Sequence, residues 1–202
     1  MSEGRIVDLG RADYEPVWRR MKELRVERKR GRIPDTLLLV EHPHVYTIGV
    51  QGDEGDTYPE GIPVYHVERG GKATYHGPGQ QVGYPIVDLT PRGRDVRRFV
   101  HDLEEMVARA IEPMGVSASR VEGKRGVWVR DRKIASVGIA VEDWVTYHGF
   151  ALNVSTDLSY FERFHPCGFE GRIMTSLERE LDRKVSLDEV RPDLVRAWND
   201  LF

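Results

Sequence analysis

Three β-like runs that follow one another between residues 126 and 154 constrain the fold of this chain more than any other feature. They read GVWVR, KIASVGIAVE and TYHGFALNV, and Asp131-Arg132 is expected to form a tight turn between the first two. Strands joined by such short turns pair in the antiparallel direction. The sequence therefore predicts an antiparallel meander, whose apolar face needs a second layer to cover it.

Amphipathic patterns predict the helices of that layer. The clearest helix begins after Asp95 and ends before Gly115, and its apolar residues recur at helical spacing. These residues are Phe99, Leu103, Met106, Val107, Ala110 and Ile111. An earlier helix is expected within residues 13–31, and a last one after the capping box formed by Ser186 and Glu189.

Short runs of β-branched and apolar residues predict further strands. They lie at residues 5–9, 36–41, 45–48, 64–68 and 82–87. No repeat, low-complexity tract or linker divides the chain, and 202 residues suit one well-packed core. We therefore expect a single domain over residues 1–202 of the α/β class, in its α+β form, with a mixed, largely antiparallel sheet and flanking helices.

Charge and composition argue against several kinds of partner. The 30 lysine and arginine residues nearly balance the 33 aspartate and glutamate residues, so no nucleic acid and no anionic membrane is expected to bind. The first residues lack the apolar stretch of a signal peptide, and no segment approaches the roughly 20 apolar residues that span a bilayer. A single cysteine fits a reducing compartment, so we expect a cytoplasmic protein.

The most unusual segment lies between two predicted strands and reads RGGKATYHGPGQ over residues 69–80. Its glycines allow positive φ angles and close approach of backbone N–H groups to a ligand, while Thr74, His76 and Gln80 can exchange hydrogen bonds. Two interpretations stay open, a loop that cradles a ligand and a wide surface turn. A nucleotide P-loop is excluded, because the spacing GxxxxGK[ST] is absent.

Cys167, Lys133 and His148 are the candidates for chemistry. Cys167 lies in HPCG, where proline and glycine favour a loop, and a nearby cation would lower the pKa of an accessible thiol there. Lys133 opens an apolar strand, where partial burial would help it to exchange protons near neutral pH. His148 is expected to line the same cavity as His76. A structural cysteine, a solvated lysine and a core histidine are the ordinary alternatives.

A metal site is a weaker interpretation of some of the same residues. The sequence lacks the CxxC and HxxxH spacings that are typical of zinc ligands, so we expect no metal. The side chains that such a site would have to use are His42, His44, His76, His148, His165 and Cys167.

Four of these segments resemble a known family in their order and spacing. The runs RGGKATYHGPGQ, KIASVG, TYHGFALNV and PCG, with EHPHVYTIG near residue 41, are similar to the lipoyl(octanoyl) transferases over roughly residues 5 to 200. The resemblance implies the fold of the biotin protein ligase and lipoate ligase catalytic domains. It implies transfer of an octanoyl group from octanoyl-acyl carrier protein, through a cysteine thioester, to a lysine of lipoyl domains. The acceptors would be 2-oxoacid dehydrogenases and the glycine cleavage H protein, and no cofactor would be needed.

The resemblance also implies roles for individual residues. Cys167 would be the nucleophile that carries the acyl group and Lys133 the residue that activates it, with His148 as a supporting candidate. The residues expected to contact the acyl group are Arg69, Gly70, Gly71, Lys72, Ala73, Thr74, Tyr75, His76, Ser136, Val137, Gly138, Gly149, Phe150 and Ala151.

Three other functions stay open for the sequence alone. An ATP-dependent lipoate ligase would activate a free acid as an adenylate and would need no nucleophilic cysteine. A non-catalytic module that binds acyl carrier or lipoyl domains would leave Cys167 inert. A cysteine hydrolase would consume the thioester without any acceptor protein.

Overall fold

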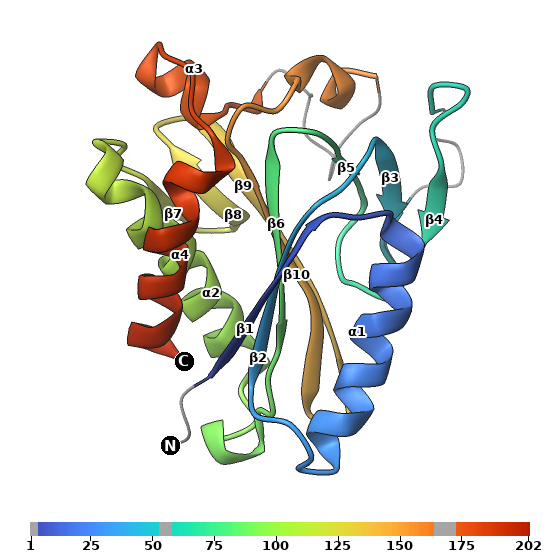
Figure 1. Ribbon diagram of the computed structural model, residues 1–202. Coiled ribbons are helices and arrows are strands. Elements are labelled where there is room, and N and C mark those ends of the chain that lie inside the picture. The colour runs from blue at the N-terminus through green and yellow to red at the C-terminus, as the bar shows by residue number, and fades with distance from the viewer. Residues whose placement is uncertain (1–3, 53–57, 164–172) are drawn as a thin grey trace.

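The main element of the fold is a seven-stranded sheet, seen in a computed structural model that describes residues 4–52, 58–163 and 173–202 (Figure 1). In spatial order its strands are β1 (Arg5–Arg11), β2 (Thr36–Glu41), β6 (Gln80–Ile86), β10 (Val145–Asn153), β9 (Arg132–Glu142), β8 (Lys124–Val129) and β7 (Ser119–Val121). β1 pairs with β2 in parallel, and the other neighbours pair antiparallel. The predicted meander is confirmed as β8, β9 and β10, and the mixed, largely antiparallel sheet is confirmed with it.

A second, three-stranded sheet was not predicted. Its order is β4 (Val64–His66), β3 (Val45–Ile48) and β5 (Ala73–His76). β5 lies inside the glycine-rich segment, so the prediction of one continuous loop over residues 69–80 is wrong in its middle. The four residues of β5 are all buried and form a strand, while the glycines lie on either side of them and make the turns.

Helices cover both faces of the large sheet (Figure 1). On one face lies α1 (Tyr14–Lys29), and on the other lie α2 (Val96–Ile111) and α4 (Leu187–Leu201). The remaining helical elements are α3 (Leu177–Leu181) and the 3₁₀ turns η1 (Thr90–Arg92), η2 (Glu112–Met114) and η3 (Leu158–Phe161). None of the helices in the described part of the chain is long and apolar enough to cross a membrane.

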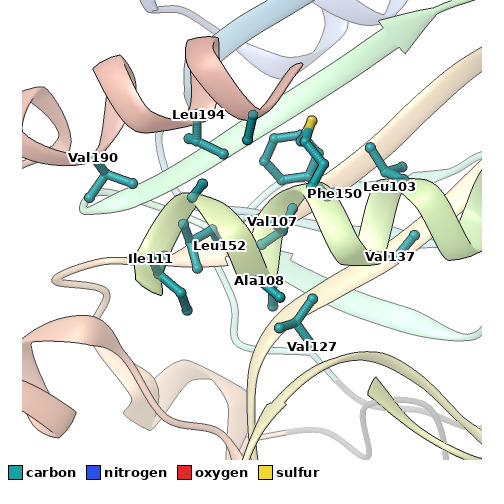
Figure 2. Packing of buried hydrophobic residues seen from close by; sticks show 14 of the residues in the cluster. Leu103, Val107, Ala108, Ile111, Val127, Val137, Phe150, Leu152, Val190 and Leu194 are labelled. Carbon is teal, nitrogen blue, oxygen red and sulfur yellow. The ribbon is translucent and has the colours of Figure 1, made fainter. Parts of the chain in front are cut away.

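Side-chain alternation along the strands divides the interior into two apolar clusters. Phe150 and Leu152 of β10 point to the α2 side, where they meet Val107 of α2 and Leu194 of α4 (Figure 2). Ala151, between them in sequence, points to the opposite side with α1. The stripe predicted for the helix after Asp95 is confirmed, because all six of its apolar residues are buried in the first cluster.

The turn between β8 and β9 lies one residue earlier than predicted. Val129 pairs with Arg132, so the two turn residues are Arg130 and Asp131. Arg130 has a φ of 55°, a left-handed conformation that few non-glycine residues adopt. An arginine in the sequence does not indicate such a conformation. Composition alone therefore did not locate this turn.

Gly149 is placed where the centre of the sheet leaves no space for a side chain. A Cβ there would overlap the carbonyl oxygen of Gly83 on β6 and lie 2.5 Å from Cδ of Pro85. We expect Gly149→Ala to lower the free energy of unfolding by about 1–3 kcal/mol, measured by urea denaturation. Gly70→Ala is the control, since its nearest contact would be 3.4 Å from Nη1 of Arg125, and a loss of equal size in both variants would contradict this explanation.

Candidate active site

A cavity of about 260 Å³ brings most of the predicted site residues together. The glycine-rich segment contributes Arg69, Gly70, Gly71, Lys72, Thr74 and His76 to its wall. The meander contributes Lys133, Ser136, Val137, Gly138, His148, Gly149, Phe150 and Ala151. Segments far apart in the sequence thus share one cavity.

Ala73 and Tyr75 do not line this cavity. Successive residues of a strand point to opposite sides, so Thr74 and His76 face the cavity while Ala73 and Tyr75 face a separate apolar cluster with Tyr46. Their side chains pack on the face of β5 that is turned away from the cavity.

Five lining residues were missed by the sequence reasoning: Tyr14, Gln51, Tyr84, Gly123 and Arg125. Tyr14 and Tyr84 look like ordinary core residues of a helix and a strand, and they are buried. Their convergence on the cavity depends on how α1 and β6 pack, which no local pattern reveals.

Arg69 holds the glycine-rich segment in shape. Its side chain is buried and donates hydrogen bonds to the carbonyl oxygens of Thr47 at 2.7 Å, Lys72 at 2.8 Å and Gly70 at 3.2 Å. The N–H of Gly70 donates in turn to the carbonyl of Ile139 on β9, at 2.9 Å. The segment is therefore tied both to β3 of the small sheet and to β9 of the large one.

Small residues form the cavity wall along the meander. Ser136 pairs with Ala151 across β9 and β10, and Gly138 pairs with Gly149. A Cβ on Gly138 would lie 2.9 Å from the carbonyl oxygen of Gly70, so the backbone segments approach as closely as they do only because this residue is glycine. The four small residues leave a narrow trough beneath the glycine-rich segment.

Lys133 is buried at the beginning of β9, with 5% of its surface exposed. Gly126 on β8 makes room for it, since a Cβ there would lie 2.6 Å from Cε of Lys133. The ammonium nitrogen lies 5.9 Å from the centre of the Trp128 ring. Met174 forms a bridge with Lys133, and the N–H of Thr175 donates to the Lys133 carbonyl at 2.9 Å. Cys167 itself lies outside the described residues.

His42 has one tautomer that satisfies both of its ring nitrogens. Nδ1 lies 2.7 Å from the carbonyl oxygen of Ala12, which can only accept, so Nδ1 donates. Nε2 then accepts from the hydroxyl of Tyr84 at 3.0 Å. Burial lowers the pKa of His42 to about 4, and burial likewise lowers the pKa of the neighbouring His76 to about 3. Both rings are therefore neutral near pH 7.

His148 has a backbone conformation that is rare for its residue type. Its φ is 57°, inside β10, and its side chain is buried. Regular alternation would direct the ring toward α2, but the left-handed φ turns it to the cavity side, where it lies 5.0 Å from the Tyr147 ring. Nε2 lies 3.3 Å from the Glu68 carboxylate, while burial lowers the pKa of His148.

The described residues contain no group of three histidine, cysteine, aspartate or glutamate side chains placed to hold a metal ion. Among the histidines weighed as ligands, His42 bonds Tyr84, His44 bonds the hydroxyl of Tyr75 at 2.7 Å, and His76 bonds Gln80 at 2.8 Å. Their ring nitrogens thus serve hydrogen bonds within the protein.

The lowered pKa of His42 makes stability depend on pH. Because the folded-state pKa lies below the unfolded value of about 6.5, the contribution is complete above pH 6.5 and is lost as pH falls toward 4. The free energy of unfolding of the wild type should fall by roughly 3 kcal/mol from pH 7 to pH 4 because of His42. In His42→Asn, whose amide can still donate to Ala12, we expect this part of the decrease to be absent. Denaturant titrations at each pH measure this, with the exposed His101→Asn as control. An unchanged pH dependence in His42→Asn would contradict it.

Comparisons with known proteins identify the family of this chain. Residues 13–199 match the lipoyl protein ligase A/B catalytic domain. An octanoyltransferase of Geotalea uraniireducens is 47% identical over 186 residues, covering 92% of this chain and 87% of that protein. A probable octanoyltransferase of Pyrobaculum calidifontis is 49% identical over 196 residues, covering 97% of this chain and 84% of that protein.

Solved structures share the fold at low sequence identity. A lipoate-protein ligase A bound with ATP superposes with a TM-score of 0.77 at 21% identity, over 98% of this chain and 85% of the other. The biotin protein ligase of Aquifex aeolicus gives a TM-score of 0.56 at 12% identity, over 99% and 69% of the two chains. The expected ligase-like fold is confirmed. Since the sequence identity to the octanoyltransferases is far higher and extends over nearly the whole chain, the protein belongs to the octanoyltransferase family.

Proposed function

We propose that this octanoyltransferase carries the acyl group as a thioester on Cys167 and that Lys133 activates the thiol. The donor is octanoyl-acyl carrier protein, and the acceptor is a lysine of a lipoyl domain in a 2-oxoacid dehydrogenase or in the glycine cleavage H protein. The position of Lys133 is the main support for this proposal. It is a buried lysine on the wall of the cavity, and Met174, seven residues after Cys167, forms a backbone bridge with it.

The first step exchanges one thioester for another. The Cys167 thiolate attacks the acyl carbonyl, a new carbon–sulfur bond forms, and the carrier thiolate leaves and takes up a proton. The exchange is nearly balanced, because the attacking and leaving groups are both thiolates. A lysine ammonium near the thiol favours the thiolate form and raises the fraction that reacts. No ATP is consumed, since the acyl group arrives as a thioester.

The second step forms an amide. The ε-amine of the acceptor lysine attacks the Cys167 thioester, the carbon–sulfur bond breaks, and the thiolate recovers the proton that the amine releases. Donors that stabilise the oxyanion of such an intermediate contribute about 2.7–4 kcal/mol each in comparable sites. The N–H of Gly70 already donates to Ile139, which leaves other N–H groups of the glycine-rich segment, or those near Gly168, as the candidates.

The trough supports an unbranched acyl chain as the cargo. Ser136, Gly138, Gly149 and Ala151 bring no bulky side chain into it, because the larger side chains of Val137 and Phe150 point to the opposite side of the sheet, into the α2 cluster. A saturated chain gains about 0.8 kcal/mol for each methylene that it buries in such a site. Adenylate formation, as in an ATP-dependent ligase of the same fold, has no comparable support from sequence identity.

Intact mass spectrometry tests the proposal. The protein is incubated with octanoyl-acyl carrier protein, without ATP, before and after a lipoyl domain is added. We expect the wild type to gain one octanoyl group that moves to the lipoyl domain, Cys167→Ala to gain none, and Lys133→Ala to load at least about tenfold more slowly because its thiol is less ionised.

Lys184→Ala is the matched control, because it removes an exposed lysine that does not line the cavity; it should load at the wild-type rate. Acylation of the lipoyl domain that needs free octanoate and ATP would instead identify a ligase. Release of free octanoate without transfer would identify a hydrolase. The first result would refute the role given to Cys167, and the second would refute transfer to an acceptor lysine.

A further inference from the structure

We propose that a layer of polar rings closes the end of the cavity away from Lys133 and sets the length of the acyl chain. The layer consists of His76, Tyr84 and His148, together with Arg69 and Tyr14, and we call it the polar end. This inference rests on the proposed function, because it takes the reacting carbonyl to lie near Lys133. It extends that function by identifying the residues that limit the length of the bound acyl chain.

The register of the meander places His148 far from Lys133. His148 pairs with Ile139, six residues beyond Lys133 on β9, and Ile134 is an extra residue in the pairing with β8, so the separation corresponds to roughly 17 Å at about 3.3 Å per residue. The trough pairs Ser136 with Ala151 and Gly138 with Gly149 between these two points. An acyl chain whose carbonyl lies near Lys133 therefore extends along the trough toward His148.

The available length suits a medium chain. Carbon–carbon bonds of about 1.5 Å advance an extended chain by roughly 1.3 Å each, so eight carbons span roughly 9 Å. The rest of the distance between the two backbone positions is occupied by the Lys133 side chain and by the rings of the polar end. Additional methylene groups would have to enter the space of those rings.

Hydrogen bonds hold the polar end in place. His148 bonds Glu68 at 3.3 Å, and the same carboxylate accepts from Trp18 at 3.0 Å and pairs with Lys22 at 2.6 Å. The Tyr84 hydroxyl donates to His42 at 3.0 Å. Moving either ring aside would leave buried polar groups without partners, so a longer chain cannot displace them without a large loss of affinity.

The backbone of His148 indicates that its ring is needed on this side of the sheet. A φ of 57° is unfavourable for a residue with a Cβ, and its effect is to bring the imidazole out of the α2 core and into the cavity. Glycine adopts the same φ without strain. His148→Gly therefore removes the ring while preserving the local backbone.

Binding of free fatty acids tests the polar end without requiring acyl transfer. Calorimetric titration with the six-, eight-, ten- and twelve-carbon acids should show wild-type affinity rising about fourfold per methylene to eight carbons and falling beyond. In His148→Gly the rise should continue to ten carbons, so that the ratio of decanoate to octanoate affinity increases at least about tenfold. The control His66→Ala, at an exposed residue of β4, should keep the wild-type profile.

Two results would overturn the inference. One is a wild-type affinity that keeps rising through twelve carbons, and the other is a folded His148→Gly protein with the wild-type turning point. If His148→Gly does not fold, His148→Asn replaces it, because asparagine tolerates the positive φ and has a shorter side chain than histidine; we expect an increase of about twofold to fourfold in the same ratio, and an unchanged ratio there also overturns the inference. A wild type that shows the turning point but forms no Cys167 adduct refutes the proposed function and leaves the polar end intact.

Discussion

The close approach of the glycine-rich segment to β9 is the constraint on which the rest of the site depends. At Gly138 the two backbones come so near that a Cβ would lie 2.9 Å from the Gly70 carbonyl oxygen, and the Gly70 N–H bonds Ile139. Arg69 fixes the other side of the segment to Thr47 of the small sheet. These contacts join the two sheets, and the cavity is the space that remains between them. Without them the residues of the meander would line an open surface, where an acyl chain would stay in contact with water.

A second chain of contacts connects the apolar core to Lys133. Glu104 of α2 is buried, and its carboxylate accepts from the backbone N–H of Gly126 at 2.6 Å and from Arg120 at 2.8 Å. Gly126 has a φ of 108° and provides the space that the Lys133 side chain occupies. The helix on one face of the sheet thereby fixes a strand residue that shapes the end of the cavity where Lys133 lies, on the other face. The burial of Lys133 thus follows from packing that extends well beyond the site.

The sequence predicted those parts of the structure that local patterns determine. The meander and α2 follow from periodicities of two and 3.6 residues, and both are confirmed. β5 was missed because its four residues are too few for a pattern and have glycines on both sides. Tyr14 and Tyr84 reach the cavity only through tertiary packing. The left-handed φ of His148 could not be predicted, because histidine rarely adopts this conformation. The roles of Cys167 and Lys133 came from the resemblance to a family and remain predictions.

The proposed mechanism depends on electrostatic coupling between Lys133 and Cys167, and the pH dependence of Cys167 alkylation measures that coupling. Iodoacetamide reacts with the thiolate, so the rate measured from pH 5 to pH 10 follows the ionisation of this single cysteine. We expect a wild-type midpoint at least about one pH unit below the 8.5 of a free thiol, and a midpoint in Lys133→Ala that returns toward that value. A wild-type midpoint at or above 8.5, or the same midpoint in both proteins, would contradict it.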